Sequence, residues 1–252
     1  MRLSDSIKIK RDDKMNNDIQ ILKEMIKNSK NIVFFGGAGV STESGIPDFR
    51  SKDGLYNQQY KYPPETILSH TFFMNKTEEF FRFYKLKMNS LKYQPNITHI
   101  KLSELEARGK LKAVITQNID GLHQKNGSKV VYELHGSVLR NYCMNCHKFY
   151  DAEYVFNSNG IPRCSCGGII KPDVVLYEEG LDEETIEKSI YAIQNADLLI
   201  VAGTSLTVQP ASGLINFFRG RNLVLINRDS TPYDNKANLV INDSLGKVFS
   251  NL

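Results

Sequence analysis

The sequence predicts an α/β fold, a doubly wound, Rossmann-like parallel sheet that carries a second, smaller lobe. Short runs rich in Val, Ile and Leu alternate with helical patterns, which is typical of a parallel sheet covered on both faces. An aromatic stretch at about 46–90 and a cysteine-bearing stretch at about 138–170 interrupt this alternation. Because the chain returns to the alternating pattern after each stretch, both are predicted to be insertions that form the smaller lobe.

The individual elements follow from these patterns. Six apolar runs predict core strands at residues 31–35, 111–116, 130–134, 197–202, 222–226 and 238–241. Helical patterns are found at residues 18–29, 77–90, 97–108, 183–194 and 210–217. The predicted core therefore comprises residues 15–45, 91–137 and 171–252, and the smaller lobe comprises residues 46–90 and 138–170.

Composition limits the class of protein without indicating its function. The 252 residues suffice for a sizeable core, and 41% hydrophobic with 24% charged residues is ordinary globular usage. Five basic and three acidic side chains before Met15 account for half of the net charge of +4. The rest of the chain is nearly neutral, so no direct nucleic-acid partner is expected.

The N-terminal residues 1–14 are polar, and we expect a disordered extension there before a folded domain at 15–252. No apolar run approaches the roughly 18 residues of a membrane span, and a secretory signal is lacking. We therefore expect a cytoplasmic protein with no membrane partner. In that reducing compartment, cysteines more often bind metal or react than form disulfides.

A glycine-rich turn follows the first predicted strand. Gly36, Gly37 and Gly39 permit a tight turn, in which backbone N–H groups can approach a pyrophosphate. Thr42 replaces the third glycine of the dinucleotide fingerprint, and ordinary strand-to-helix turns also contain G-x-G. The turn alone thus leaves nucleotide binding open.

Polar residues also follow two later strands. Gln117, Asn118 and Asp120 come after the strand at 111–116, and the loop 203–205 follows the strand at 197–202. Ligands of open α/β sheets bind beyond the carboxyl ends of strands, so these loops are predicted to converge on one crevice. The alternative is that they are ordinary turn and cap residues.

The four cysteines form two pairs, Cys143 with Cys146 and, after 17 intervening residues, Cys164 with Cys166. Four thiolates at this spacing are typical of a closed tetrahedral zinc site, and two following glycines allow the turn that the shorter pair needs. A redox CxxC is the alternative, although it does not explain the second pair. We predict one structural zinc ion, with the adjacent His147 as a surface residue.

A longer string extends the glycine turn. GAGVSTESGIPDFR, from Gly37 to Arg50, resembles the signature of the sirtuins, NAD-dependent protein deacylases, here of a bacterial, class U-like type. The strings TQNID from Thr116, HG from His135 and GTS from Gly203 are similar to further motifs of that family, in its order and spacing. The resemblance runs from about residue 16 to the C-terminus.

The resemblance implies that NAD is a co-substrate. Nicotinamide leaves the ribose, the acyl oxygen of an acyl-lysine replaces it, and His135 acts as general base on a ribose hydroxyl, with Asn118 also catalytic. The products are free lysine, nicotinamide and O-acyl-ADP-ribose. Histidine suits this task because its pKa of about 6.5 leaves much of it neutral near physiological pH.

The NAD-binding residues that the resemblance implies extend over several loops. They are Ala38, Gly39, Thr42, Asp48, Phe49, Arg50, Gln117, Asn118, Ile119, Asp120, His135, Gly203, Thr204, Ser205, Asn227 and Asp243. Asn118, Ile119 and Asp120 would form the nicotinamide pocket, in which Asp120 accepts hydrogen bonds from the carboxamide. Gln117 would hold ribose hydroxyls, and Phe49 would cover the reacting face. Contacts to ribose and pyrophosphate would come from Ala38, Thr42 and Arg50, and contacts to adenosine from Thr204, Ser205, Asn227 and Asp243.

A substrate segment is implied in the same way. Val174, Val175 and Leu176 resemble the family stretch that pairs its backbone with an acyl-lysine peptide, a mode that reads main chain more than sequence. Glu178 stands where the family usually has Gly, so the local turn is expected to differ.

The acyl preference is indicated by a further pair of residues. Family members that favour acidic acyl groups carry a Tyr and, three residues on, an Arg, whereas this chain has Tyr84 and Lys87. Lysine lacks the planar fork that grips a carboxylate, so acetyl and other uncharged groups are expected.

Three other functions are alternatives for this sequence. A mono-ADP-ribosyltransferase would use the same NAD site, but it would not clearly need His135. A nicotinamide oxidoreductase is disfavoured because Thr42 replaces a glycine and no acidic residue closes the following strand. A zinc-ribbon nucleic-acid module would need a basic aromatic face, which the segment 143–166 lacks.

Overall fold

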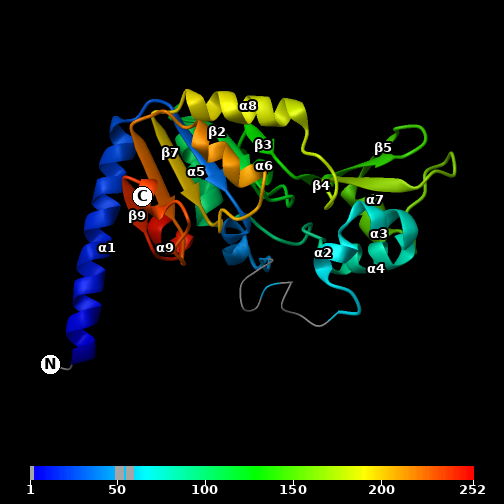
Figure 1. The fold of residues 1–252 in the computed structure, drawn as a ribbon, viewed down its shortest axis with the longest axis horizontal. Coiled ribbons are helices and arrows are strands. Elements are labelled where there is room, and N and C mark those ends of the chain that lie inside the picture. The colour runs from blue at the N-terminus through cyan, green and yellow to red at the C-terminus, as the bar shows by residue number, and fades with distance from the viewer. Residues whose placement is uncertain (1–2, 49–53, 55–59) are drawn as a thin grey trace.

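Two lobes of unequal size make up the molecule, and the computed structural model describes residues 3–48, 54 and 60–252 (Figure 1). The larger lobe holds a six-stranded parallel sheet in the order β3-β2-β1-β7-β8-β9. Its strands are β1 (Ile32–Gly36), β2 (Leu111–Thr116), β3 (Val131–Glu133), β7 (Leu198–Ala202), β8 (Asn222–Ile226) and β9 (Leu239–Ile241). Each overlaps a predicted apolar run, so the doubly wound sheet is confirmed.

The sheet has its switch point between β1 and β7, where the direction of winding reverses. Gly36 at the end of β1 lies in register with Thr116 of β2 and with Ala202 of β7. The three central strands therefore end level. Because ligands of doubly wound sheets bind at such a switch point, the loops after these strands are the place to seek a site.

Helices cover both faces of this sheet, as the alternation of apolar runs and helical patterns predicts. One face is covered by α1 (Leu3–Asn28), α5 (Ile97–Ala107) and α9 (Leu245–Phe249), and the other by α8 (Glu183–Gln194) and the 3-10 helix η4 (Ala211–Phe217). In β1, Phe34 packs toward the first set of helices and Phe35 toward the second. Alternation of side chains along a strand thus supplies both cores.

The helices depart from the predicted ranges in two places. Helix α1 extends back to Leu3, into the stretch 1–14 for which a disordered extension was expected, and that expectation stays a prediction. The stretch has no Gly or Pro that would end the helix running back from Asn28. The helical pattern at 210–217 forms 3-10 turns and not an α-helix. Among the described residues no helix combines the length and apolar character needed to cross a membrane.

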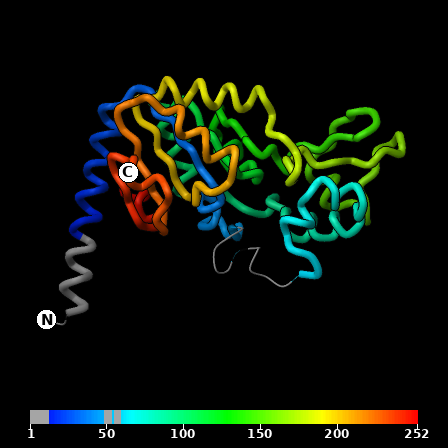
Figure 2. The backbone as a smooth tube through the Cα atoms, in the orientation of Figure 1, coloured from blue at the N-terminus to red at the C-terminus, as the bar shows by residue number. Residues whose placement is uncertain are grey.

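The smaller lobe combines the two insertions around one core (Figure 2). The first insertion supplies α2 (Pro64–Ile67), α3 (His70–Asn75) and α4 (Thr77–Lys87). The second supplies α7 (Ala152–Asn157) and an antiparallel sheet, β5-β4-β6, of β4 (Gly136–Cys143), β5 (Phe149–Asp151) and β6 (Ile170–Val174). Phe80 and Phe81 of α4 lie in the same cluster as Cys143 and Ile170. The sheet extends a few residues beyond the predicted 138–170 at each end.

Candidate active site

The loops after β1 and β7 approach each other closely. Gly39 donates its N–H to the carbonyl of Gly203 over 2.8 Å. A Cβ on Gly39 would lie 2.7 Å from the Cα of Gly203, which itself has a φ of +62°. Both glycines are therefore needed for loop-to-loop packing, a reason that the sequence reading did not give. The loops consequently form a fixed rim at the switch point.

A cavity of about 790 Å³ opens beside this rim, between the two lobes. Its volume lies within the range of small-molecule and cofactor sites, about 300–1,000 Å³. The predicted NAD-binding residues that line it are Ala38, Gly39, Asp48, Gln117, Asn118, Ile119, Asp120, His135, Gly203, Thr204, Ser205 and Asn227. Thr42 and Asp243 are not among the described residues that line it. Phe49 and Arg50 lie outside the described residues.

A buried cluster of polar side chains forms one wall of the cavity. Ser41 donates its hydroxyl proton to Asp120 Oδ2 over 2.7 Å and accepts a hydrogen bond from Asn118 Nδ2 over 3.0 Å. The N–H of Leu122 binds Asp120 Oδ1 at 2.9 Å. Burial raises the pKa of Asp120 above its usual value, and the hydrogen bonds from Leu122 and Ser41 partly offset this. The cluster presents an acceptor in a site with little water.

His135 lies at the end of β3 and lines the same cavity. Its Nδ1 is 2.9 Å from the carbonyl oxygen of Gln117, which can only accept. We assign the proton to Nδ1 on this basis, so that Nε2 is the free acceptor. Burial lowers the pKa of His135, although the hydrogen bond to Gln117 opposes this. A neutral imidazole with a fixed tautomer is the form required of a general base.

Other predicted residues have partners within the chain. Gln117 Nε2 donates to Thr204 Oγ1 over 3.1 Å, which joins the loops after β2 and β7. Thr42 supports the glycine loop, because its hydroxyl donates to the carbonyl of Gly39 over 3.0 Å. Asp243 pairs with Lys247 at 3.1 Å and is directed to α9.

Sequence reasoning missed two polar residues near the cavity. Ser41 holds both Asn118 and Asp120, and Arg228 lines the cavity and donates to Thr42 Oγ1 over 3.3 Å. Ser41 lies within the GAGVS string, and Arg228 directly follows Asn227. These positions, within or next to the motifs, were the only indication in the sequence that the two residues lie at the site.

The predicted substrate segment is already hydrogen-bonded on its donor side. Val175 donates its N–H to the carbonyl of His135 over 3.0 Å, and Leu176 donates to Glu179 Oε2 over 2.9 Å. Glu178 adopts a φ of +76°, the conformation that glycine favours, and its carboxylate accepts the N–H of Thr71 over 2.8 Å. The backbone is therefore left-handed here although the residue is not glycine, and the side chain ties this turn to α3.

The acyl-preference pair lines the same cavity on the smaller-lobe side. Tyr84 is fully buried, its hydroxyl has no hydrogen-bond partner among the described residues, and burial raises its pKa. Lys87 Nζ lies 5.4 Å from the centroid of the Tyr60 ring. This wall therefore combines a buried aromatic hydroxyl with one lysine ammonium.

The four cysteines come together at the far end of the smaller lobe. Their sulfur atoms all lie within 4.8 Å of one another, and Cys143 to Cys166 and Cys146 to Cys164 are each 3.5 Å apart. These separations exceed the roughly 2.05 Å of a disulfide. They suit a zinc ion bound at about 2.3 Å from each sulfur. The chemistry and spacing of the donors thus fit a structural zinc, and His147 is not part of the group.

The fold and the cavity define a Rossmann-like protein with a dinucleotide-sized site between two lobes. The family model described as "Sir2 family" matches residues 37–210, and the chain belongs to this family. It is 63% identical to an NAD-dependent protein deacetylase of Clostridium perfringens (93% of this chain, 98% of the relative). A deacetylase of the same name from Clostridium acetobutylicum is 61% identical (91% and 96%).

Solved Sir2 structures superpose on most of the chain. A Sir2 structure with a deacetylated p53 peptide and 3'-O-acetyl ADP ribose has a TM-score of 0.85 at 37% identity, covering 92% of this chain and 96% of that one. A Sir2 complex with a p53 peptide and NAD+ has a TM-score of 0.82 at 38% identity, covering 92% and 95%.

Proposed function

We propose that this chain is an NAD-dependent protein-lysine deacetylase that releases nicotinamide and O-acetyl-ADP-ribose. The observation that carries the proposal is a single cavity that holds both a partly buried, neutral His135 and the Asp120 cluster. Relatives at up to 63% identity bear the name NAD-dependent protein deacetylase, and the neighbouring structures contain NAD+ or its acetylated product. The roles of the individual site residues are part of this proposal.

The NAD molecule would supply an anomeric carbon from which nicotinamide can leave. Ser41 and Leu122 hold the Asp120 carboxylate in place, so that it can accept the hydrogen bonds of a carboxamide. Asn118, which shares Ser41 with Asp120, would complete this pocket together with Ile119. Glycine N–H groups and the loop 203–205 would hold the phosphates and adenosine.

His135 would act as the general base on a ribose hydroxyl through Nε2. Its Nδ1–H is fixed by the carbonyl of Gln117, so the ring cannot rotate to present the wrong nitrogen. Gln117, linked to Thr204, would position the ribose. A general base placed in this way contributes about 10²- to 10⁴-fold to the rate.

An acyl-lysine protein would enter between the lobes along segment 174–176. Since the N–H groups of Val175 and Leu176 already have acceptors, pairing with a peptide would use the carbonyl of Val175 and groups further along. Lys87 beside Tyr84 keeps a positive charge but lacks the planar fork that binds a carboxylate, so we expect acetyl over acidic acyl groups. We place the enzyme in the cytoplasm and expect no nucleic-acid or membrane partner.

One assay tests the proposal. Purified protein is incubated with NAD and an acetyl-lysine peptide, and mass spectrometry follows loss of acetyl, O-acetyl-ADP-ribose and nicotinamide. Stoichiometric formation of deacetylated peptide and O-acetyl-ADP-ribose supports it. Nicotinamide release without peptide, together with ADP-ribose attached to protein, would instead indicate a mono-ADP-ribosyltransferase.

A further inference from the structure

The strand β4 contains an irregularity close to the active site. Ser137 pairs with Asp173 of β6, but the next paired residue, Asn141, lies opposite Pro172. Residues 138–140 are therefore extra residues on β4 and form a β-bulge. Bulges change the direction of side chains and are frequent next to active sites, so this bulge is expected to have a role in the site.

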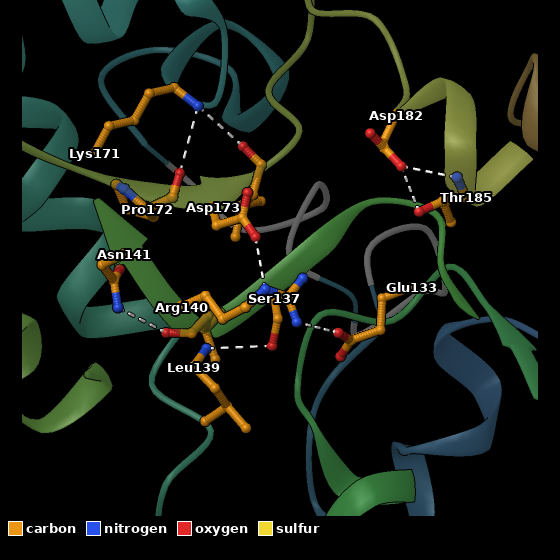
Figure 3. Close-up of polar contacts among 12 residues, drawn as sticks. Glu133, Ser137, Leu139, Arg140, Asn141, Lys171, Pro172, Asp173, Asp182 and Thr185 are labelled. Carbon is orange, nitrogen blue, oxygen red and sulfur yellow. Dashed lines mark hydrogen bonds and ion pairs between the residues drawn. The ribbon is translucent and has the colours of Figure 1, made fainter. Parts of the chain in front are cut away.

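The bulge at 138–140 is held in a defined shape. Asn141, which is fully buried, donates from Nδ2 to the carbonyl of Val138 over 3.2 Å. Leu139 donates its N–H to Ser137 Oγ over 3.3 Å. Figure 3 shows both contacts, together with the side chain of Arg140, which extends toward Glu133 and Asp173.

Arg140 bridges two carboxylates from different lobes (Figure 3). Its Nη1 lies 2.6 Å from Glu133 Oε2, at the end of β3, and its Nε lies 2.7 Å from Asp173 Oδ2, in β6. The Glu133 side chain is only 6% exposed, and its Oε1 has no hydrogen-bond partner among the described residues. Without Arg140 this carboxylate would be an uncompensated buried charge.

The two carboxylates lie next to residues of the proposed mechanism. Glu133 precedes His135 by two residues, and Asp173 precedes Val175 by two. A backbone hydrogen bond from Val175 to the carbonyl of His135 joins the same two segments that the Arg140 ion pairs join. The guanidinium thus fixes the spacing between the histidine and the substrate segment at a second point.

The same bulge also contacts the proposed nicotinamide pocket. Val138 donates its N–H to the carbonyl of Ile119 over 3.0 Å. Leu139 packs so closely on Gly121, which has a φ of +73°, that a Cβ there would clash with its side chain. Residues 138–140 therefore contact three parts of the proposed site: the turn at 119–121, the end of β3 before His135, and β6 before the segment 174–176.

We propose that Arg140 is a positioning residue for deacetylation. Through the bulge at 138–140 it holds His135, the turn at 119–121 and the segment 174–176 in one arrangement. The inference rests on the proposed function, because it assigns Arg140 a part in that reaction. A guanidinium is needed because two carboxylates are bound through two different nitrogens, which a lysine ammonium cannot reproduce in the same geometry.

The test compares Arg140→Met and Arg140→Lys with the wild type in steady-state kinetics. Arg140→Met should lower kcat and raise the KM for acetyl peptide, reducing kcat/KM about 10- to 100-fold, because small misplacements of reacting groups are costly. Direct NAD binding should weaken less than kcat/KM falls, since the ion-pair partners of Arg140, Glu133 and Asp173, are not among the residues proposed to contact NAD. Arg140→Lys should recover only part of the loss.

A matched control removes an arginine from an ion pair elsewhere. Arg108 is 69% exposed and pairs with Glu104 on α5 at 3.8 Å, so Arg108→Met should leave the kinetics unchanged. Asp173→Asn should lower kcat/KM alone, but it should add little to Arg140→Met, because coupled residues are not additive. If Arg140→Met does not fold, the partly exposed Asp173→Asn still tests the bridge.

Wild-type kcat/KM in folded Arg140→Met, or in folded Asp173→Asn, would overturn the proposal. Amide hydrogen exchange gives a readout that does not need activity. Arg140→Met should raise exchange at 133–137 and 173–177 together, and unchanged exchange there would also overturn it. A wild-type protein that does not deacetylate would refute the proposed function, whereas joint loss of protection in the variant would still support the bridge.

Discussion

At the scale of single residues, the proposed general base His135 gives the most direct test of the mechanism. Replacing it in His135→Ala should reduce kcat/KM for deacetylation by about 10²- to 10⁴-fold, because the general base is lost. NAD binding should change little, since Asp120 and the loop 203–205 are intact. Kinetics and calorimetric NAD binding check this, with the circular dichroism spectrum as the folding control. Near-normal turnover would refute the assignment of His135 as base.

Two other histidines, His99 and His123, affect stability and not catalysis. His99 and His123 are buried with their rings 4.7 Å apart, and neither nitrogen of His123 has a hydrogen-bond partner among the described residues. Burial lowers the pKa of His99 to about 4, and burial together with the nearby His99 lowers that of His123 to about 3. Both rings are therefore neutral in the fold at pH values where the unfolded chain protonates them.

This difference predicts a pH dependence of stability. Above the unfolded pKa of about 6.5 the two histidines do not lower the unfolding free energy. Below it, each histidine lowers the unfolding free energy by about 1.4 kcal/mol per pH unit, until the pH reaches the folded pKa of that histidine. His123→Leu should make the slope between pH 6 and pH 4 shallower by about that amount. Denaturant titrations at several pH values measure it, with the exposed His147→Ala as control. An unchanged slope in His123→Leu would contradict the expectation.

Many of the residues that line the cavity could be predicted from the sequence, and the exceptions have a physical cause. Asp120 and His135 stand just beyond predicted strands, where ligands of such sheets bind. Ser41 was missed because its role depends on a contact with Asp120, 79 residues away, which no local pattern reveals. Asp243 was included by resemblance, but Lys247 and α9 occupy its carboxylate.

At the scale of elements, the core strands were predictable and those of the smaller lobe were not. Strand β7 is buried along its whole length, so it is a continuous apolar run. Strand β6 contains Lys171 and Pro172, which argue against a strand by composition. Pro172 is tolerated because β6 lies at the edge of its sheet. The three-stranded sheet depends on pairing and on the cysteine cluster more than on local propensity.

The cluster of four cysteines holds the elements of the smaller lobe together and predicts a loss of stability without zinc. Cys164→Ser, or chelation, should lower the free energy of unfolding by several kcal/mol, because the binding energy of a structural zinc is folding energy. Metal analysis should find one zinc per wild-type chain and much less in the variant. His147→Ala should keep its zinc, since that ring is outside the four-thiol group. Soluble, active wild-type protein without zinc would refute the assignment.

At the scale of the whole molecule, the cavity is made by both lobes, and neither could form it alone. The core contributes Asp120 and the loop 203–205, while the smaller lobe contributes Tyr84 and the segment 174–176. The contact from Val175 to His135 joins the substrate side directly to the proposed base. Binding of an acyl-lysine peptide between the lobes should therefore affect the fate of NAD in the core.

This coupling predicts the dependence of nicotinamide release on peptide. Release from NAD alone should be slow and should rise steeply with acetyl-lysine peptide, because only then is an acyl oxygen placed to replace nicotinamide. Free nicotinamide should inhibit by re-entering the pocket of Asn118, Ile119 and Asp120 and reversing that step, so added NAD should not fully relieve the inhibition. Asp120→Asn should weaken both effects, since an amide also donates where the carboxylate only accepts. Nicotinamide measured with and without peptide decides this, and rates independent of peptide would contradict it.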